Sequence, residues 1–198
     1  MDPIERITEI SAVAAAAGIN PWLAALTLVG LSALDMVDMG TLPFLESELA
    51  DPAILTALVA AFLLEQVADK IPGVDHVSDL VHLPIKPAAA VGLAMMVAGP
   101  DDPARLADYW IPLAVAAAAV ALITHLGKAG LRSGSTLATG GMGNPVLSAL
   151  EDVGVVGLIV LAVLLPIVSL ALVALVLWLS VRGIAKLLRR LPVPLSTT

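Results

Sequence analysis

The sequence contains no cysteine, and both charged and aromatic residues are scarce. Without cysteine, disulfides and thiolate metal sites are excluded. Charged residues make up 14% of the chain, whereas a soluble domain usually carries about 25%. Aromatic residues make up only 3%, so a large aromatic core does not replace the missing charge. The chain therefore has too little charge to cover a soluble globule.

The charge pattern also lacks a basic N-terminal segment and a basic surface. The first ten residues, MDPIERITEI, are acidic and lack the basic segment of a signal peptide, so we expect the first apolar run to stay in the mature protein. The formal net charge of −7 is carried by short clusters between apolar runs. This pattern gives no basic surface, and no nucleic acid is expected as a partner.

Long runs without charge are what the sequence has instead. Ile10–Leu34, Tyr109–Gly127 and Val153–Val181 contain 25, 19 and 29 residues without a charged side chain, counting histidine as neutral. About 20 apolar residues cross the hydrocarbon core of a bilayer as a helix. We predict an all-α, polytopic transmembrane bundle of five to six membrane segments. Residues 1–198 would form one integral membrane domain in the cell (inner or plasma) membrane, with the lipid bilayer as its partner.

Proline, glycine and charge divide the chain into expected helices. They are 4–17, 21 to about 39, 52–70, 75–99 with an interruption at 84–87, 104–137 with a kink or restart at Pro112, and 145–181 with a kink at Pro166. The basic residues Arg182, Lys186, Arg189 and Arg190 predict a cytoplasmic C-terminus. Lys128 and Arg132 conflict with this orientation if one simple crossing follows them. Either the glycine-rich break at 138–145 is re-entrant, or the charge rule is violated there.

Two Asn-Pro pairs follow small-residue segments, one in each half of the chain. Asn20-Pro21 follows AAAGI, and Asn144-Pro145 follows TGGMG. Asparagine suits the N-cap and proline the first helical position, so each pair predicts a helix start directly after a helix end. Broken helices in matching positions are typical of transporters with inverted repeats, and the repeat halves would be 1–99 and 104–190. The alternative is that each pair forms an interfacial turn between two ordinary helices.

Between the two pairs lies a segment rich in acids and histidines. Glu65 and Asp69 share one helix face, and Asp75, Asp79 and His82 share the next. A helical hairpin would bring both faces together, with Lys70 between them, and Glu151 and Asp152 are the best partners from the second half. Such a group suits a divalent cation, a proton relay or a charged headgroup. The metal ligands would be Asp75, His76, Asp79 and His82, although the spacing matches no specific metal motif. The alternative is a solvated loop with capping acids.

His125, alone near the end of an apolar run, is expected at the membrane interface.

The segments AAAAGINP at 14–21 and EQVADKIPGVD at 65–75 resemble a bacterial family of small multi-pass integral membrane proteins, domain of unknown function 4126. The second half is similar to the same family at Ser135-Thr136, Thr139–Gly141, Asn144-Pro145 and Glu151-Asp152. The resemblance covers most of the chain. It implies an integral membrane protein with these segments as its signature, and it supplies no activity and no catalytic residues.

Three functions remain open. The leading hypothesis is a small transporter, channel or lipid-headgroup translocator, whose substrate or ion pathway would use the polar residues named above: Asn20, Pro21, Glu65, Asp69, Lys70, Asp75, Asp79, Asn144, Pro145, Glu151 and Asp152. A chain of this size would form a homodimer to enclose a path. The second is a membrane-embedded, metal-dependent enzyme acting on a lipid phosphate. No HExxH, phosphate-loop or Ser-His-Asp pattern supports it. The third is a structural or assembly subunit.

Overall fold

The computed structural model describes residues 3–37, 48–49, 51–69, 71, 74–98 and 103–189. Side chains are described throughout these ranges except at positions 3, 75, 76, 103–109 and 187. Within them the chain forms seven helices and no strand. The helices are α1 (Pro3–Ile19), α2 (Pro21–Ser32), α4 (Pro52–Ala68), α5 (Val74–Ala98), α6 (Pro103–Thr139), α7 (Asn144–Leu164) and α8 (Pro166–Leu188).

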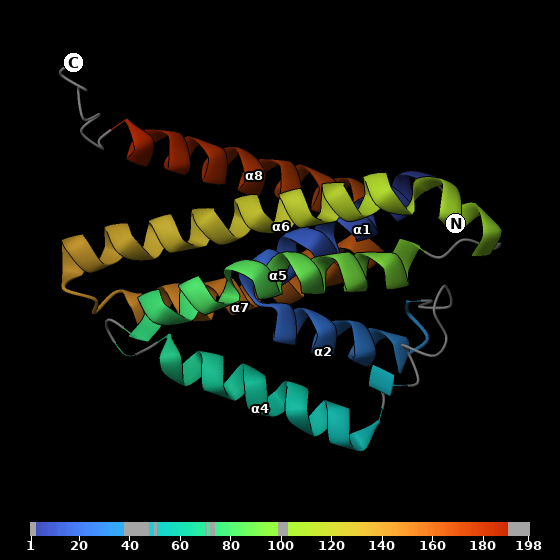
Figure 1. Ribbon diagram of the computed structural model, residues 1–198, viewed down its shortest axis with the longest axis horizontal. Helices are drawn as coiled ribbons and strands as arrows, with labels where there is room; N and C mark the ends of the chain where they lie inside the picture. The colour runs from blue at the N-terminus through green and yellow to red at the C-terminus, as the bar shows by residue number, and fades with distance from the viewer. Residues whose placement is uncertain are drawn as a thin grey trace, which may run out of the picture.

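The helices lie mostly along the long axis of the molecule (Figure 1). A tight turn joins α6 to α7 at one end, where α4 and α8 also end and α5 begins; we call this the α6–α7 end. The hairpin of α1 and α2 enters from the opposite end and reverses direction inside the bundle, at Asn20. The reversal places a helix end in the interior.

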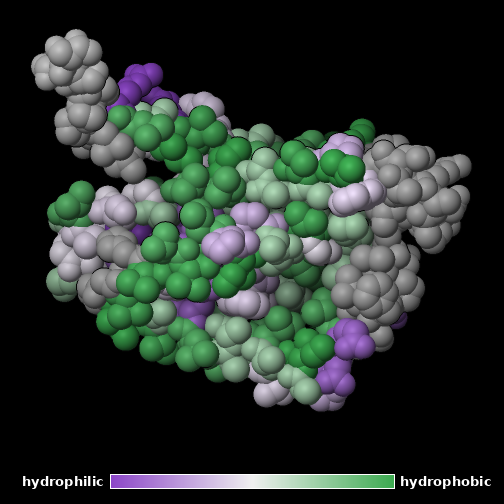
Figure 2. All heavy atoms as spheres, in the orientation of Figure 1, coloured by the Kyte–Doolittle hydropathy of each residue, from purple (hydrophilic) through white to green (hydrophobic). Residues whose placement is uncertain are grey.

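Four helices of the described chain are long and apolar enough to cross a membrane. These spans are Val77–Ala98, Trp110–Thr139, Asn144–Leu164 and Pro166–Lys186, and the shorter apolar helices are Pro21–Ser32 and Pro52–Ala68. Large apolar side chains lie exposed on the outside, among them Leu63 and Leu64 of α4 and Leu175 and Trp178 of α8. Apolar residues cover much of the face in Figure 2. Together these features indicate a membrane protein, and the predicted all-helical class is confirmed.

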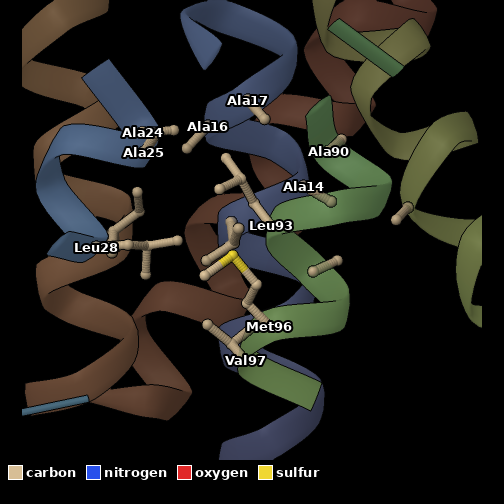
Figure 3. Packing of buried hydrophobic residues seen from close by; sticks show 14 of the residues in the cluster. Ala14, Ala16, Ala17, Ala24, Ala25, Leu28, Ala90, Leu93, Met96 and Val97 are labelled. Atoms are coloured by element: carbon tan, nitrogen blue, oxygen red, sulfur yellow. The ribbon is translucent and has the colours of Figure 1, made fainter. Parts of the chain in front are cut away.

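Helix α1 is the centre of the bundle, because α2, α5, α6, α7 and α8 all pack against it. Residues 12–17, five alanines and one valine, are at most 1% exposed. Figure 3 shows alanines of α1 and α2 facing Leu93, Met96 and Val97 of α5. Small residues let helix backbones approach closely, which is how membrane helices associate without a hydrophobic driving force between them. The alanine-rich segment of the sequence is therefore a packing surface.

Prolines inside two helices do not interrupt them. Helix α5 is continuous through Pro84 and Pro87, and α6 is continuous through Pro112. The predicted interruption at 84–87 is therefore wrong. Membrane helices tolerate proline because neighbouring helices and local adjustments satisfy the backbone groups that it frees.

The last apolar run forms two helices instead of one kinked span. Helix α7 ends at Leu164 and α8 begins at Pro166. The hydroxyl of Ser169 donates to the carbonyl oxygen of Leu158 (2.9 Å), although these residues would lie about 16 Å apart in a straight helix at 1.5 Å per residue. Helix α8 therefore folds back on α7 and ends at the α6–α7 end. The fold-back removes the charge conflict noted for Lys128 and Arg132, because two crossings and not one separate them from the basic end of α8.

The second Asn-Pro pair begins α7, directly after the turn at the α6–α7 end. Gly140 and Gly141 adopt positive φ of 63° and 89°, a conformation that glycine accepts without strain. The Thr139 hydroxyl accepts from the Gly143 amide (2.9 Å), and the Asn144 side chain donates to the Thr136 hydroxyl (3.0 Å). Asn144 is the first residue of α7 and not its N-cap. The repeat of 1–99 and 104–190 stays a prediction.

Candidate functional site

The site begins with the backbone at the end of α1. Asn20 adopts an extended conformation (φ −145°, ψ 100°), and its side-chain oxygen accepts from the Leu23 amide (3.1 Å) as the N-cap of α2. In a continuous helix the Leu23 amide would instead donate to the Ile19 carbonyl. Pro21 has no N–H to give to α1 either. The Ile19 carbonyl is therefore left without a helical donor in the interior of the bundle.

Two lysines from other helices satisfy this carbonyl. Lys86 of α5 and Lys128 of α6 both donate from Nζ to the Ile19 oxygen, at 2.8 and 3.0 Å. The C-terminal end of a helix carries a partial negative charge, so cations are stabilised there. The ammonium groups thus complete the broken end of α1 in both hydrogen bonding and charge.

Carboxylates from two further helices surround these cations. The Lys86 ammonium lies 3.2 Å from Glu65 of α4, and Arg132 of α6 contacts Asp69 at 2.6 Å and Glu151 at 2.5 Å. The Lys128 ammonium lies 3.4, 3.6 and 3.5 Å from the same three carboxylates, in that order. We call Glu65, Asp69, Lys86, Lys128, Arg132 and Glu151 the charged cluster. Its formal charges cancel, with three cations against three carboxylates.

A layer of amides and hydroxyls adjoins the charged cluster. Asp152 of α7 accepts from the Asn20 side chain (3.2 Å) at one oxygen and from the Gln66 amide at the other. Ser148 donates to Gln66 (3.4 Å). Asp152 thereby lies beside the N-terminus of α2, where a negative charge is favoured. The two half-helix ends at Asn20 thus face charges of opposite sign.

Burial makes this arrangement costly to disturb. Side chains of Lys86 and Arg132 are fully buried, those of Glu65, Asp69 and Lys128 are at most 4% exposed, and Glu151 is 14% exposed. Two polar atoms of the cluster, Oε2 of Glu65 and Nη1 of Arg132, have no hydrogen-bond partner in the described part of the chain. Such groups carry a desolvation cost of about 1–3 kcal/mol each, or more when charged. The charged cluster therefore has one acceptor atom and one donor atom that can still form a hydrogen bond.

The structure brings together five of the residues singled out from the sequence: Asn20, Glu65, Asp69, Glu151 and Asp152. Pro21 starts α2 next to them. Asn144 and Pro145 begin α7, directly after the turn at the α6–α7 end. Lys70 lies outside the described residues, as do the side chains of Asp75 and His76.

The remaining predicted residues lie on α5, outside the charged cluster. The Asp79 carbonyl accepts from Nε2 of His125 (3.0 Å), which is buried between α5 and α6, so the predicted interfacial position of His125 is wrong. His82 contacts the Ser78 carbonyl through Nδ1 (2.8 Å), and its ring meets Trp22 edge-on. No group of three or more histidine, aspartate or glutamate side chains among those described could hold a metal ion. The predicted set at 75, 76, 79 and 82 stays a prediction, because two of its side chains are not described.

A groove reaches the charged cluster from the outside of the bundle. It has a volume of about 410 Å³ and lies between α6, α7 and α8. Its walls are mostly leucine and glycine, and the polar residues that line it are Thr124, Lys128, Glu151 and Ser180. We call the two charged residues, Lys128 and Glu151, its polar floor. Two residues of the charged cluster thus line a groove on the outside of the bundle.

Comparison with protein families matches residues 7–186 to the family described as Domain of unknown function (DUF4126). The chain belongs to this family. The matched range contains every residue of the charged cluster, the Asn20 break and the groove. No curated protein and no solved structure matches the chain. Family membership supplies no activity, so the function of this DUF4126 protein has to be argued from the site.

Three cations and one amide of the site were missed by sequence reasoning. Lys86 stands between two prolines in PIKP, and the sequence pattern presents Lys128 and Arg132 only as orientation signals. A usable signal was present, because a lone cation inside an apolar run is costly unless a carboxylate pairs with it. Gln66 gave no such signal, since an uncharged amide beside Glu65 is common on a helix surface.

Proposed function

We propose that this DUF4126 protein is a small transporter or channel for a charged or strongly polar solute, and that the charged cluster is its site. One observation carries the proposal: six mutually paired ionisable side chains from four helices converge on a helix end inside an otherwise apolar bundle. Ionisable residues inside membrane helices are rare, and they mark substrate, ion or proton pathways.

Stability alone gives a weak account of such a cluster. Replacing a buried ion pair by apolar residues of similar volume is often neutral or stabilising. Lys128 contacts three carboxylates and one carbonyl, so its partners can be exchanged without leaving it unpaired. If a solute replaces one of these partners, the Lys128 ammonium keeps its contacts with the others.

The broken helix supports the same proposal. Transporters place half-helix ends near the middle of the membrane, where the partial charges of the ends face substrate or coupling ions. In this chain the Ile19 carbonyl and the Asn20 cap lie at such a break, with lysines on one side and Asp152 on the other. The inverted repeat and the homodimer that would enclose a path belong to this proposal.

Flux measurements on protein reconstituted into liposomes test the proposal. Gradients of H⁺, Na⁺, K⁺, chloride and inorganic phosphate would be applied one at a time, with protein-free vesicles as background. We expect flux of at least one ion in wild-type vesicles, its loss in Lys128→Gln and partial retention in Lys128→Arg. Arg182→Gln, an exposed cation outside the cluster, should leave the flux unchanged. Flux at background for all five gradients, or equal flux in Lys128→Gln and wild type, would count against the proposal.

A further inference from the structure

The groove between α6, α7 and α8 has the shape of a site for one hydrocarbon chain. Helix α8 packs against both α6 and α7, while α6 and α7 make few direct contacts with each other, which leaves the groove open. Its lining on α7 extends from Leu147 to Leu161, about 21 Å at 1.5 Å per residue. One leaflet of a bilayer core is about 15 Å thick. The groove is therefore long enough for the chain of a membrane amphiphile.

Glycine on α7 creates the open volume. Gly154 and Gly157 both line the groove, and a Cβ added at either position would meet no atom within 4 Å. By contrast, a Cβ at Gly127 of α6 would overlap Ser180 of α8, so these two helices touch at the back wall. The groove is thus open because α7 carries glycines on this wall, and a larger side chain at either position would fill the groove.

We infer that this groove binds a single-chain amphiphile with a small, uncharged, hydroxyl-bearing head, whose head contacts Lys128 and Glu151. The helices that form the walls are apolar and of membrane length, so hydrocarbon and not water surrounds the mouth of the groove. An apolar groove of about 410 Å³ within this medium is filled by chains of matching chemistry.

The floor of the groove selects the head. A buried head with net charge needs a counter-charge, whereas Lys128 and Glu151 already serve as counter-charges to each other. The ion pair of Lys128 and Glu151 (3.5 Å) offers both a donor and an acceptor to a hydroxyl. Glu151 lies about 10 Å along α7 from its first residue, Asn144, whereas the headgroup region of one leaflet is about 5–8 Å thick. A small uncharged head is the kind that enters this depth.

Binding in the groove does not depend on whether the cluster transports a solute. The probe is a monoacylglycerol with a photoreactive diazirine in its chain, incorporated into proteoliposomes and mapped after irradiation by peptide mass spectrometry. We expect labelling of the groove residues Leu158, Leu172 and Val176 to exceed that of Leu63 and Leu64, which are exposed on α4. Gly157→Leu should reduce the groove labelling about tenfold or more.

The matched control is Gly130→Leu on α6, where an added Cβ also meets no atom but the residue does not line the groove. It should label as the wild type does. If Gly157→Leu does not give monodisperse protein, Gly154→Ala combined with Gly157→Ala narrows the same wall. Equal labelling of groove and α4 residues, or full labelling after the groove is filled, would overturn the inference.

Competition defines the head. Unlabelled monoacylglycerol should displace the probe, whereas an alkyl sulfonate, an alkyl trimethylammonium of equal chain length and phosphatidylethanolamine should not. Displacement by one of the charged amphiphiles or by the phospholipid would refute the assignment of a small uncharged head. Disulfide-linked dimers from Leu150→Cys, which lies exposed at the groove, would show that a second copy covers the groove, and would also overturn the inference.

Discussion

Lys128 illustrates at the scale of one residue how the bundle tolerates charge. Its ammonium has a carbonyl at 3.0 Å and three carboxylates between 3.4 and 3.6 Å. None of the three ion pairs has the close geometry of Arg132 with Glu151. Arg132 therefore fixes the carboxylates through its planar, directional donors, while Lys128 acts as a compact charge shared among them.

Removing Arg132 should destabilise the protein strongly. We expect Arg132→Gln to lower the free energy of unfolding by about 3–5 kcal/mol, because it leaves buried carboxylates without their cation. The exposed Arg182 stacks on Trp178 at 5.0 Å, and Arg182→Gln should cost about 1 kcal/mol or less. Thermal unfolding in detergent, followed by size-exclusion chromatography, compares the two. Equal losses of stability would mean that the charged cluster contributes no more than a surface contact.

The residues of the site could be predicted in part. Carboxylates and Asn-Pro pairs are informative in sequence, because acids in a charge-poor chain and helix starts after small-residue runs each have a stated physical cost. They led to Asn20, Glu65, Asp69, Glu151 and Asp152, which do lie together. Pairing across helices could not be predicted, because it depends on which faces of α5 and α6 turn inward. Lys86, Lys128 and Arg132 were missed for this reason.

At the scale of the elements, the α1–α2 hairpin depends on the contact of Asn20 with Asp152. Asn20→Asp keeps the N-cap acceptor but sets two carboxylates against each other, and we expect clear destabilisation. When Asp152→Asn is added, the amide at position 152 can donate to the carboxylate at position 20, which reverses the wild-type direction of the hydrogen bond. The double variant should therefore recover more stability than the single changes predict, with a coupling of about 0.5–3 kcal/mol. Strict additivity in a thermal-unfolding cycle would show that the two side chains do not interact.

Close packing of α1 on α6 gives a second test at this scale. A Cβ at Gly18 would overlap the Thr124 side chain and the Ala121 backbone, whereas a Cβ at Gly30 of α2 meets nothing within 4 Å. Gly18→Ala should cost about 1–3 kcal/mol through overpacking. Gly30→Ala should be neutral or stabilise by up to about 1 kcal/mol, because alanine favours helix. A similar melting temperature for both variants would argue against this contact.

Helix boundaries were the more predictable part of the fold, and the paths of the helices were the less predictable part. Asn20-Pro21 and the glycines at 140–143 end helices by local chemistry, which a sequence displays. Pro166 shows the limit. Proline indicates a break in the helical ladder, but the angle between α7 and α8 depends on packing, including the Ser169 contact with Leu158. The sequence predicts a kink at Pro166, whereas in the structure the chain reverses direction there.

For the whole molecule, the fold-back of α8 fixes which segments share a side of the membrane. Met142 in the α6–α7 turn and Lys186 near the end of α8 are both exposed at the same end (Figure 1), and Asp35 is exposed at the other. Cysteines at Met142 and Lys186 should react with a membrane-impermeant maleimide from one side, and a cysteine at Asp35 only from the other. The basic C-terminal segment predicts that the shared side is cytoplasmic.

Labelling of right-side-out and inverted vesicles separates the possible outcomes, and the wild type, which has no cysteine, is its own background. Reaction of Met142→Cys and Lys186→Cys from opposite sides would contradict the antiparallel pairing of α7 and α8. Reaction of both from the extracellular side would leave the fold intact and reverse the predicted orientation.

The central position of α1 has a consequence for how the protein is made. Synthesis proceeds from the N-terminus, so α1 leaves the ribosome first, while α5, α6, α7 and α8, against which it packs, follow later. Glu65 and Asp69 likewise precede Lys86, Lys128 and Arg132. During biogenesis the Ile19 carbonyl at the end of α1 therefore has no lysine donor until Lys86 and Lys128 have been synthesised. Chains that stop before α6 should therefore lack a stable α1 and be cleared by quality-control proteases.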